Sequence, residues 1–213
     1  NRNPKEPLFH FDNRILAYFG CDLYEAAMAT ELKGEKTFFM PFNQGSNGAG
    51  EVGGSGNPQR DDDEYVTSYF WKDVLRRDVL LAILQRFIMR QEETTISLIQ
   101  DKHGKEKEIS ETKTKIIFPR YHQLDVVEKL IRDTEANGSG TNYLIQHSAG
   151  SGKSNSIAWL TYRLASLHNK DNANIFKGVF VVTDRRVLNR QLQETILGFE
   201  HVDGTVTTIT EDD

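Results

Sequence analysis

The stretch at residues 147–154 constrains the fold more than any other part of the sequence. It reads HSAGSGKS, follows the apolar run 143–146 and precedes the amphipathic stretch 154–168. Closely spaced glycines let the backbone curl so that successive N–H groups point inward at an anion. A helix that begins directly afterwards adds the positive end of its dipole. The pattern therefore predicts a strand, a phosphate loop and a helix in succession.

The residue types of this loop suit a nucleoside triphosphate. Lys153 can reach the β- and γ-phosphates, and the Ser154 hydroxyl can complete the coordination of Mg²⁺. We therefore expect ATP and Mg²⁺ as cofactors, Lys153 and Ser154 as catalytic residues, and Ser154 as the contact to the metal. The expected cradle consists of Ala149, Gly150, Ser151, Gly152, Lys153 and Ser154.

The loop departs from the general motif at one position, because His147 stands where the first glycine is expected. Helicase-type motors often keep only the G-x-G-K-S/T core, so the departure favours that class. The alternative is a glycine turn before an ordinary helix.

Apolar runs and amphipathic stretches alternate around the loop. Helices are predicted at 121–137, 154–168 and 187–197, and strands at 143–146, 179–183 and 205–209. This alternation implies a parallel sheet with right-handed crossovers. The predicted fold class is α/β: an N-terminal segment of strands and helix, followed by the start of a parallel-sheet phosphate-loop domain like that of RecA-type helicases.

Two clusters near the loop are candidates for ligand contacts. Gln123 offers both a donor and an acceptor to an adenine edge, and the neighbouring Arg120 and Tyr121 could cover the base. Beside a phosphate loop, this cluster resembles the adenine-reading glutamine motif of superfamily-two helicases. Its alternative is an ordinary surface helix start.

The second cluster follows the predicted strand 179–183. Ligands gather at the carboxyl ends of parallel strands, so Arg185, Arg186 and Arg190 could face a nucleic-acid backbone. The alternative is again a solvated helix start.

The N-terminal half has a different pattern. Strands are expected at 15–19, 24–32 and 37–40, with a hairpin turn at 33–36. A glycine-rich loop covers 44–64, a helix is expected at 71–92, and 101–114 is expected to be an exposed connection. We place a domain boundary near residue 108.

Composition excludes several classes. The net charge is −5, so any contact with DNA must come from a local patch. No apolar run approaches the ~20 residues that span a bilayer, and no secretory signal is recognisable, so a cytoplasmic location is expected. Cys21 is the only cysteine, which excludes an internal disulfide, and its apolar surroundings predict a buried thiol. The scattered histidines lack metal-ligand spacing, so no zinc site is expected.

Three further motifs are weaker candidates. Glu31 and Lys33 form an E-x-K pattern after Asp22, which could hold Mg²⁺, but the predicted turn favours a structural role. The acidic run 211–213 could be the Mg²⁺-binding pair of a motor, although it follows a threonine-rich stretch. The glycines at 48–53 fit G-x-G-x-x-G, but no helix follows them, so a surface loop is expected.

The chain resembles the restriction (R) subunit of type I restriction–modification enzymes. The residues that carry the resemblance are FMPFN at 39–43, FPRYHQLD at 118–125, YLIQHSAGSGKS at 143–154 and TDRRVL at 183–188. The family implies a nuclease domain and two helicase-like motor domains. ATP hydrolysis then drives translocation along double-stranded DNA before cleavage, with methylation and specificity subunits as partners.

By this resemblance, 1–108 would be the end of the nuclease domain, the glycine-rich loop and a connector helix, and 109–213 the start of the first motor domain. The chain is then expected to be a piece of a longer polypeptide. The nuclease centre and acidic ATPase box would lie outside it, so alone it should hydrolyse little ATP. The alternatives are a non-motor enzyme such as a small-molecule kinase, and a nucleotide-sensing assembly module.

Overall fold

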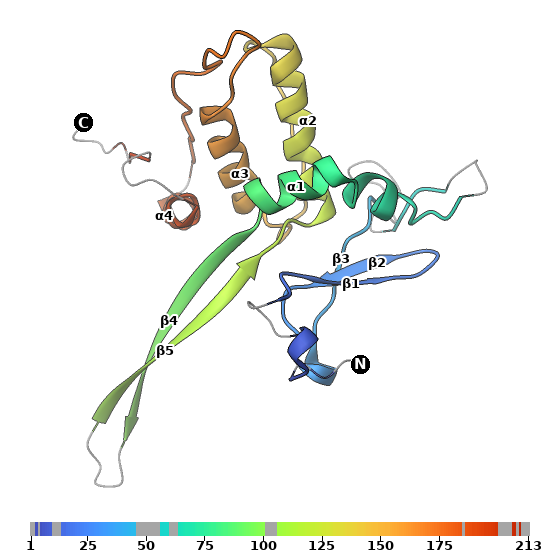
Figure 1. Cartoon of the computed structure of the whole chain (residues 1–213). Coiled ribbons are helices and arrows are strands. Elements are labelled where there is room, and N and C mark those ends of the chain that lie inside the picture. Colours follow the sequence, from blue (N-terminus) through green and yellow to red (C-terminus); the bar gives the residue numbers. More distant parts are fainter. Residues whose placement is uncertain are drawn as a thin grey trace.

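The computed structural model describes residues 3, 5–9, 14–45, 56–59, 64–100, 106–184, 186–199, 206–207 and 209. Figure 1 shows a small sheet formed by the N-terminal part, a long hairpin that projects from the body, and a group of helices that includes those at 121–137, 153–165 and 186–198. One hydrophobic cluster runs from Ala26 to Phe199 and includes residues on both sides of position 108. The division near 108 stays a prediction.

The N-terminal sheet is antiparallel, with strand order β1-β2-β3. Its strands are β1 (Tyr18–Cys21), β2 (Ala26–Ala29) and β3 (Met40–Pro41). The predicted hairpin is confirmed, since Met28 of β2 pairs with Met40 of β3 in antiparallel register. Met28 also pairs with Phe19 of β1. The strands of the hairpin are shorter than expected, and the short helix η2 (Gly34–Lys36) occupies the turn. A further short helix, η1 (Pro7–Phe9), precedes the sheet.

The thiol prediction was wrong, because Cys21 is exposed. Cys21 is the last residue of β1. The first two side chains of this strand are half-buried and the last two are exposed. An apolar neighbourhood in the sequence does not bury the end of a short strand.

The helix expected at 71–92 is interrupted and ends early. It is divided into the π-helix η3 (Phe70–Val74) and helix α1 (Arg77–Arg86). A long strand, β4 (Met89–Gln100), begins directly afterwards and pairs along its whole length with β5 (Glu106–Ile117). The exposed connection expected at 101–114 is therefore largely wrong, since residues 106–114 belong to β5. Charged side chains alternate here with threonine and isoleucine, which favour strands.

All three predicted helices of the second half are confirmed. They are α2 (Tyr121–Asn137), α3 (Lys153–Ala165) and α4 (Arg186–Gly198). α3 lies beside both α2 and α4 (Figure 1). Val127 and Ile131 of α2, Trp159 of α3 and Ile196 of α4 enter the common core.

The strands expected at 143–146 and 179–183 are not formed, and both described sheets are antiparallel. A strand persists only where a neighbour takes up its backbone N–H and C=O groups. These segments have no strand partner in the described part of the chain, and Leu144, Phe180 and Val182 are 94%, 80% and 90% exposed. Most of the third expected strand, 205–209, lies outside the described residues.

Candidate nucleotide-binding site

The loop before α3 is curled by two glycines in the left-handed region. Gly150 has φ +72° and Gly152 has φ +80°, a conformation that L side chains rarely adopt. A Cβ atom on Gly152 would lie 2.5 Å from Nε2 of Gln123 and 3.3 Å from Nη2 of Arg120. The loop therefore needs glycine at 152 both for its backbone angle and for its close approach to α2.

Side chains at the start of α2 bind the outside of the loop. Arg120 Nη2 donates to the carbonyl oxygen of Gly150 at 3.1 Å, and Gln123 Nε2 donates to that of Gly152 at 2.8 Å. The ring Nε2 of His122 lies 3.0 Å from the carbonyl oxygen of Ser151. The N–H of a trans peptide points opposite to its C=O. The carbonyls of residues 150–152 face α2, so the N–H groups of Gly152 and Lys153 point away from it, as a cradle for an anion requires. The N–H of Ser151 donates within the loop, to the Ser148 carbonyl oxygen at 3.4 Å.

Lys153 closes the loop. Its Nζ donates to the carbonyl oxygens of His147 and Ser148 at 3.2 and 2.8 Å. An ammonium has three donors, so one remains for another acceptor. α3 begins at Lys153, and the first N–H groups of a helix have no partner within it. In α3 the N–H groups of Asn155 and Ser156 donate to the Gly152 carbonyl oxygen, so the Lys153 ammonium and the N–H groups of Lys153 and Ser154 are the candidate donors here.

The residues present fit a triphosphate with Mg²⁺. The donors come from backbone N–H groups and one lysine, and Ser154 in the first turn of α3 supplies a hydroxyl of the kind that ligates Mg²⁺. The Ser151 hydroxyl is buried, and no described residue is its hydrogen-bond partner. A buried hydroxyl without a partner is costly, and a bound ligand could satisfy it.

The three residues expected near adenine have different surroundings. Gln123 is buried: its Oε1 accepts from the N–H of Arg120 at 2.9 Å, and its Nε2 holds Gly152. The Tyr121 hydroxyl accepts from Gln44 Nε2 at 2.9 Å, and its ring packs against Phe42. Burial raises the pKa of Tyr121 and lowers the pKa of Arg120. Gln123 and Arg120 contact the loop, whereas Tyr121 is a core residue. The adenine role stays a prediction.

Sequence reasoning missed a pair of histidines beside the loop. The rings of His122 and His147 lie with centroids 4.9 Å apart at 86° to each other. Desolvation is the largest cause that lowers the pKa of His122; its hydrogen bond to the Ser151 carbonyl partly offsets this, and Arg120 and His147 lower the pKa further. For His147, desolvation and then Lys153 and Arg120 lower the pKa. The signal was present in the sequence, since His147 replaces the expected glycine and His122 adjoins Gln123.

The structure describes two of the three arginines that are proposed as DNA contacts. Arg185 lies outside the described residues, and Arg186 is the first residue of α4. Arg190 is largely exposed, with its Nε 3.7 Å from Oε1 of Glu194 one turn later. Such exposed pairs contribute little stability, so Arg190 can exchange this partner for a phosphate.

The weaker candidates have the contacts of a surface turn or lie outside the described residues. Lys33 Nζ pairs with Glu31 Oε2 at 2.9 Å in the open, and Asp22 Oδ1 accepts from the N–H groups of Tyr24 and Glu25 at 2.7 and 2.8 Å. The runs 48–53 and 211–213 are outside the described part.

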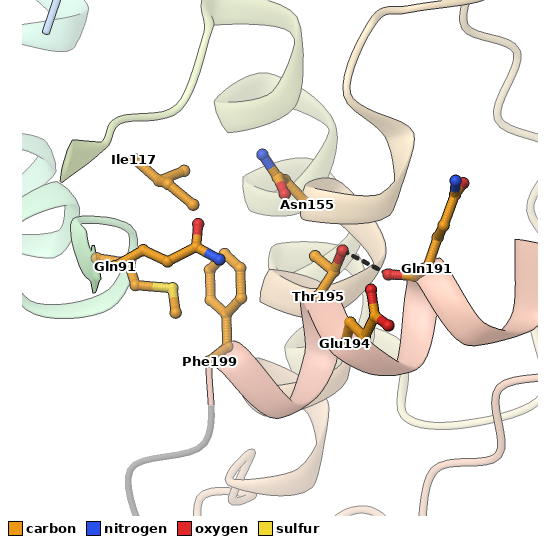
Figure 2. Close-up of a pocket in the computed structure, with 8 residues that line it drawn as sticks. Gln91, Ile117, Asn155, Gln191, Glu194, Thr195 and Phe199 are labelled. Carbon is orange, nitrogen blue, oxygen red and sulfur yellow. Dashed lines mark hydrogen bonds between the residues drawn. The ribbon is translucent and has the colours of Figure 1, made fainter. Parts of the chain in front are cut away.

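A cavity of about 280 Å³ lies next to the first turn of α3 (Figure 2). Gln91 and Ile117 at the base of the hairpin line it with Asn155 of α3. Residues of α4 complete the lining: Gln191, Glu194 and Thr195, with Phe199 just beyond the helix. The hairpin base, α3 and α4 therefore meet around a cavity that lies two residues from Lys153.

This geometry defines a candidate site for a nucleoside triphosphate on a phosphate loop. Residues 122–212 match the family model described as SWI2/SNF2 ATPase. The match covers the loop, α3 and α4, and it indicates a helicase-like ATPase. Comparisons with curated proteins and with solved structures found no match.

No helix in the described ranges is long and apolar enough to cross a bilayer. Among the same residues, no group of three or more His, Cys, Asp or Glu side chains is placed to hold a metal ion.

Proposed function

We propose that the chain carries the ATP-binding loop of a DNA-translocating motor, and that this motor is the restriction subunit of a type I restriction–modification enzyme. The curled loop with Lys153 across it is the observation that carries the proposal. The match of residues 122–212 to a helicase-like ATPase supports the motor over a kinase. The restriction enzyme is supported by the sequence resemblance alone.

The residues of this chain would have separate tasks. Bound ATP with Mg²⁺ supplies the phosphoryl group and the charge that the metal neutralises. The N–H groups of Gly152 and Lys153 and the free ammonium donor of Lys153 would hold the phosphate oxygens, while Ser154 would hold the metal. Arg120 and Gln123 keep the loop carbonyls turned outward. Holding these donors in place before binding avoids the cost of ordering them afterwards.

Nucleotide binding is tested by calorimetric titration of the purified protein with ATP and Mg²⁺. Lys153→Ala should abolish the heat of binding, because it removes the charge beside the phosphates. Lys129→Ala, at an exposed lysine of α2 that pairs with Asp125, should leave it unchanged. A wild-type protein that gives no heat would refute the proposal.

In the full-length enzyme, Lys153→Ala should abolish DNA translocation and cleavage but leave assembly with the methylation and specificity subunits intact. Assembly is measured by co-purification, and translocation by displacement of a triplex-forming strand. Wild-type ATP hydrolysis by this variant would contradict the assigned role of Lys153.

Double-stranded DNA is the proposed track, with Arg185, Arg186 and Arg190 at the start of α4 as its contacts. Arg190→Ala should weaken DNA binding and reduce the slope of log K against log salt by about 1. Arg132→Ala, on the exposed side of α2, is the matched control. Equal slopes for both variants would remove Arg190 from the interface.

A further inference from the structure

The pair of histidines beside the phosphate loop has a geometry that defines its hydrogen bonding. His122 Nε2 lies 3.0 Å from the Ser151 carbonyl oxygen. A carbonyl oxygen only accepts, so Nε2 of His122 must carry a proton and donate it. The ring of His147 stands at 86° to that of His122, with centroids 4.9 Å apart. Edge-to-face contacts of this kind restrict the orientation of both rings.

Ser151 is the central residue of the loop, between the two left-handed glycines. Its carbonyl is the middle one of the three that face α2, and its side chain is buried without a hydrogen-bond partner in the described chain. Loss of the His122 bond would leave this peptide free to rotate, and the N–H of Gly152 would turn with it. That N–H belongs to the proposed phosphate cradle.

We propose that His122 and His147 act together as positioning residues of the phosphate loop: His122 holds the Ser151 carbonyl outward, and His147 holds the ring of His122. This inference rests on the proposed nucleotide site. It also accounts for a histidine where the general motif has glycine, because a glycine at 147 would leave His122 without its ring contact.

Charged groups beside the two histidines should make nucleotide binding depend on pH. Arg120, the residue before α2, and Lys153, the first residue of α3, are both cationic and close to the rings. Without an anion, these charges and the burial disfavour protonated histidine. A triphosphate in the loop would offset these positive charges and so favour the protonated rings. Binding should therefore take up protons at pH values near and below 6.5, and affinity should rise as pH falls through that range.

The test compares variants at His122 by calorimetric titration with ATP and Mg²⁺ between pH 5.5 and 8.5. His122→Phe keeps a ring but removes the donor, and should raise the Kd about three- to tenfold at pH 8. His122→Gln places an amide donor at a similar reach and should restore most of the affinity. His147→Gly should raise the Kd similarly, and both His122→Phe and His147→Gly should reduce proton uptake. Proton uptake is measured in buffers that differ in ionisation enthalpy.

His168→Gln is the matched control, because His168 is exposed and its ring bonds only locally to the Ser166 carbonyl. Circular dichroism and thermal unfolding show whether each variant folds. A purely structural role would lower stability but would not give rescue by glutamine or a changed proton uptake. The inference is wrong if His122→Phe and His147→Gly bind nucleotide like wild type across the pH range. The nucleotide site would still stand in that case, provided that wild type binds and Lys153→Ala does not. If wild type does not bind, the proposed function itself fails.

Discussion

The Gln123 amide donates to the carbonyl oxygen of Gly152 at 2.8 Å, which joins the start of α2 directly to the start of α3. The same side chain accepts from the N–H of Arg120, the residue before α2. One buried amide thus fixes the entrance of α2 and the last glycine of the phosphate loop together.

The first prediction concerns Gly152. In Gly152→Ala, the new methyl group would meet Gln123 Nε2 at 2.5 Å and the residue would keep φ +80°. Loss of the Gln123 bond and the backbone strain should together cost about 2–3 kcal/mol in the free energy of unfolding. Gly34→Ala, also at positive φ but with no atom within 4 Å, should cost only about 1 kcal/mol. Urea denaturation measures both, and equal losses would contradict the junction.

The second prediction tests Gln123 itself. Gln123→Ala leaves the half-buried N–H of Arg120 without its partner. The Gly152 carbonyl oxygen keeps only the N–H groups of Asn155 and Ser156, so the change should cost about 1–2 kcal/mol. It should also weaken ATP binding, because Gly152 is no longer held. Urea denaturation and calorimetric titration measure the two effects. Unchanged affinity in a folded Gln123→Ala protein would show that this bond stabilises the fold without shaping the loop.

These residues also show what the sequence could predict. α2 was predicted with its observed bounds, because an apolar stripe and the glycine at 138 define it locally. The curled loop before α3 was expected from its closely spaced glycines and Lys153, and its role as a phosphate loop stays a prediction. The contacts of Gln123 could not be predicted, because they depend on how the carbonyls of a distant loop are turned. The segment 143–146 is as apolar as a strand, but its pairing depends on a non-local partner that no local pattern specifies.

The third prediction follows from the depressed pKa values of His122 and His147. The unfolded chain binds protons near pH 6.5, whereas the folded chain binds them only at lower pH. This contribution to stability is complete above pH 6.5 and is lost as pH falls through the folded pKa values. The melting temperature in the absence of nucleotide should therefore fall between pH 7.5 and 5.5. The double variant His122→Gln/His147→Gln should show a flatter profile, and an unchanged slope would contradict the shifts.

The fourth prediction concerns the ion pair between α2 and α3. Arg163 Nη1 lies 2.5 Å from Glu128 Oε1, and the two side chains are 9% and 19% exposed. Arg163 also lies over the Phe87 ring, 5.6 Å from its centroid. Glu128→Gln leaves a nearly buried guanidinium without its counter-charge and should cost about 2–4 kcal/mol.

The control for this pair is on the same helix. Lys129 and Asp125 form an exposed pair at 2.7 Å, and Lys129→Ala should cost less than about 0.5 kcal/mol. Chemical denaturation of both variants measures the difference. Equal effects would show that the Arg163 charge reaches water in solution.

The fifth prediction concerns the hairpin that projects from the body (Figure 1). Its base enters the core through Met89 and Ile116, whereas Ile96 and Ile109 further out are 65% and 41% exposed. Replacing residues 95–111 with a short Asn-Gly turn joins Thr94 to Thr112, whose hydroxyl oxygens are 3.1 Å apart. Because the described side chains of the removed part, such as Ile96 and Ile109, are exposed, the melting temperature should change by less than about 2 °C. Ile116→Ala, by contrast, empties a buried position and should cost about 2–4 kcal/mol. A shortened hairpin that melts as early as Ile116→Ala would mean that the outer ribbon packs against the protein.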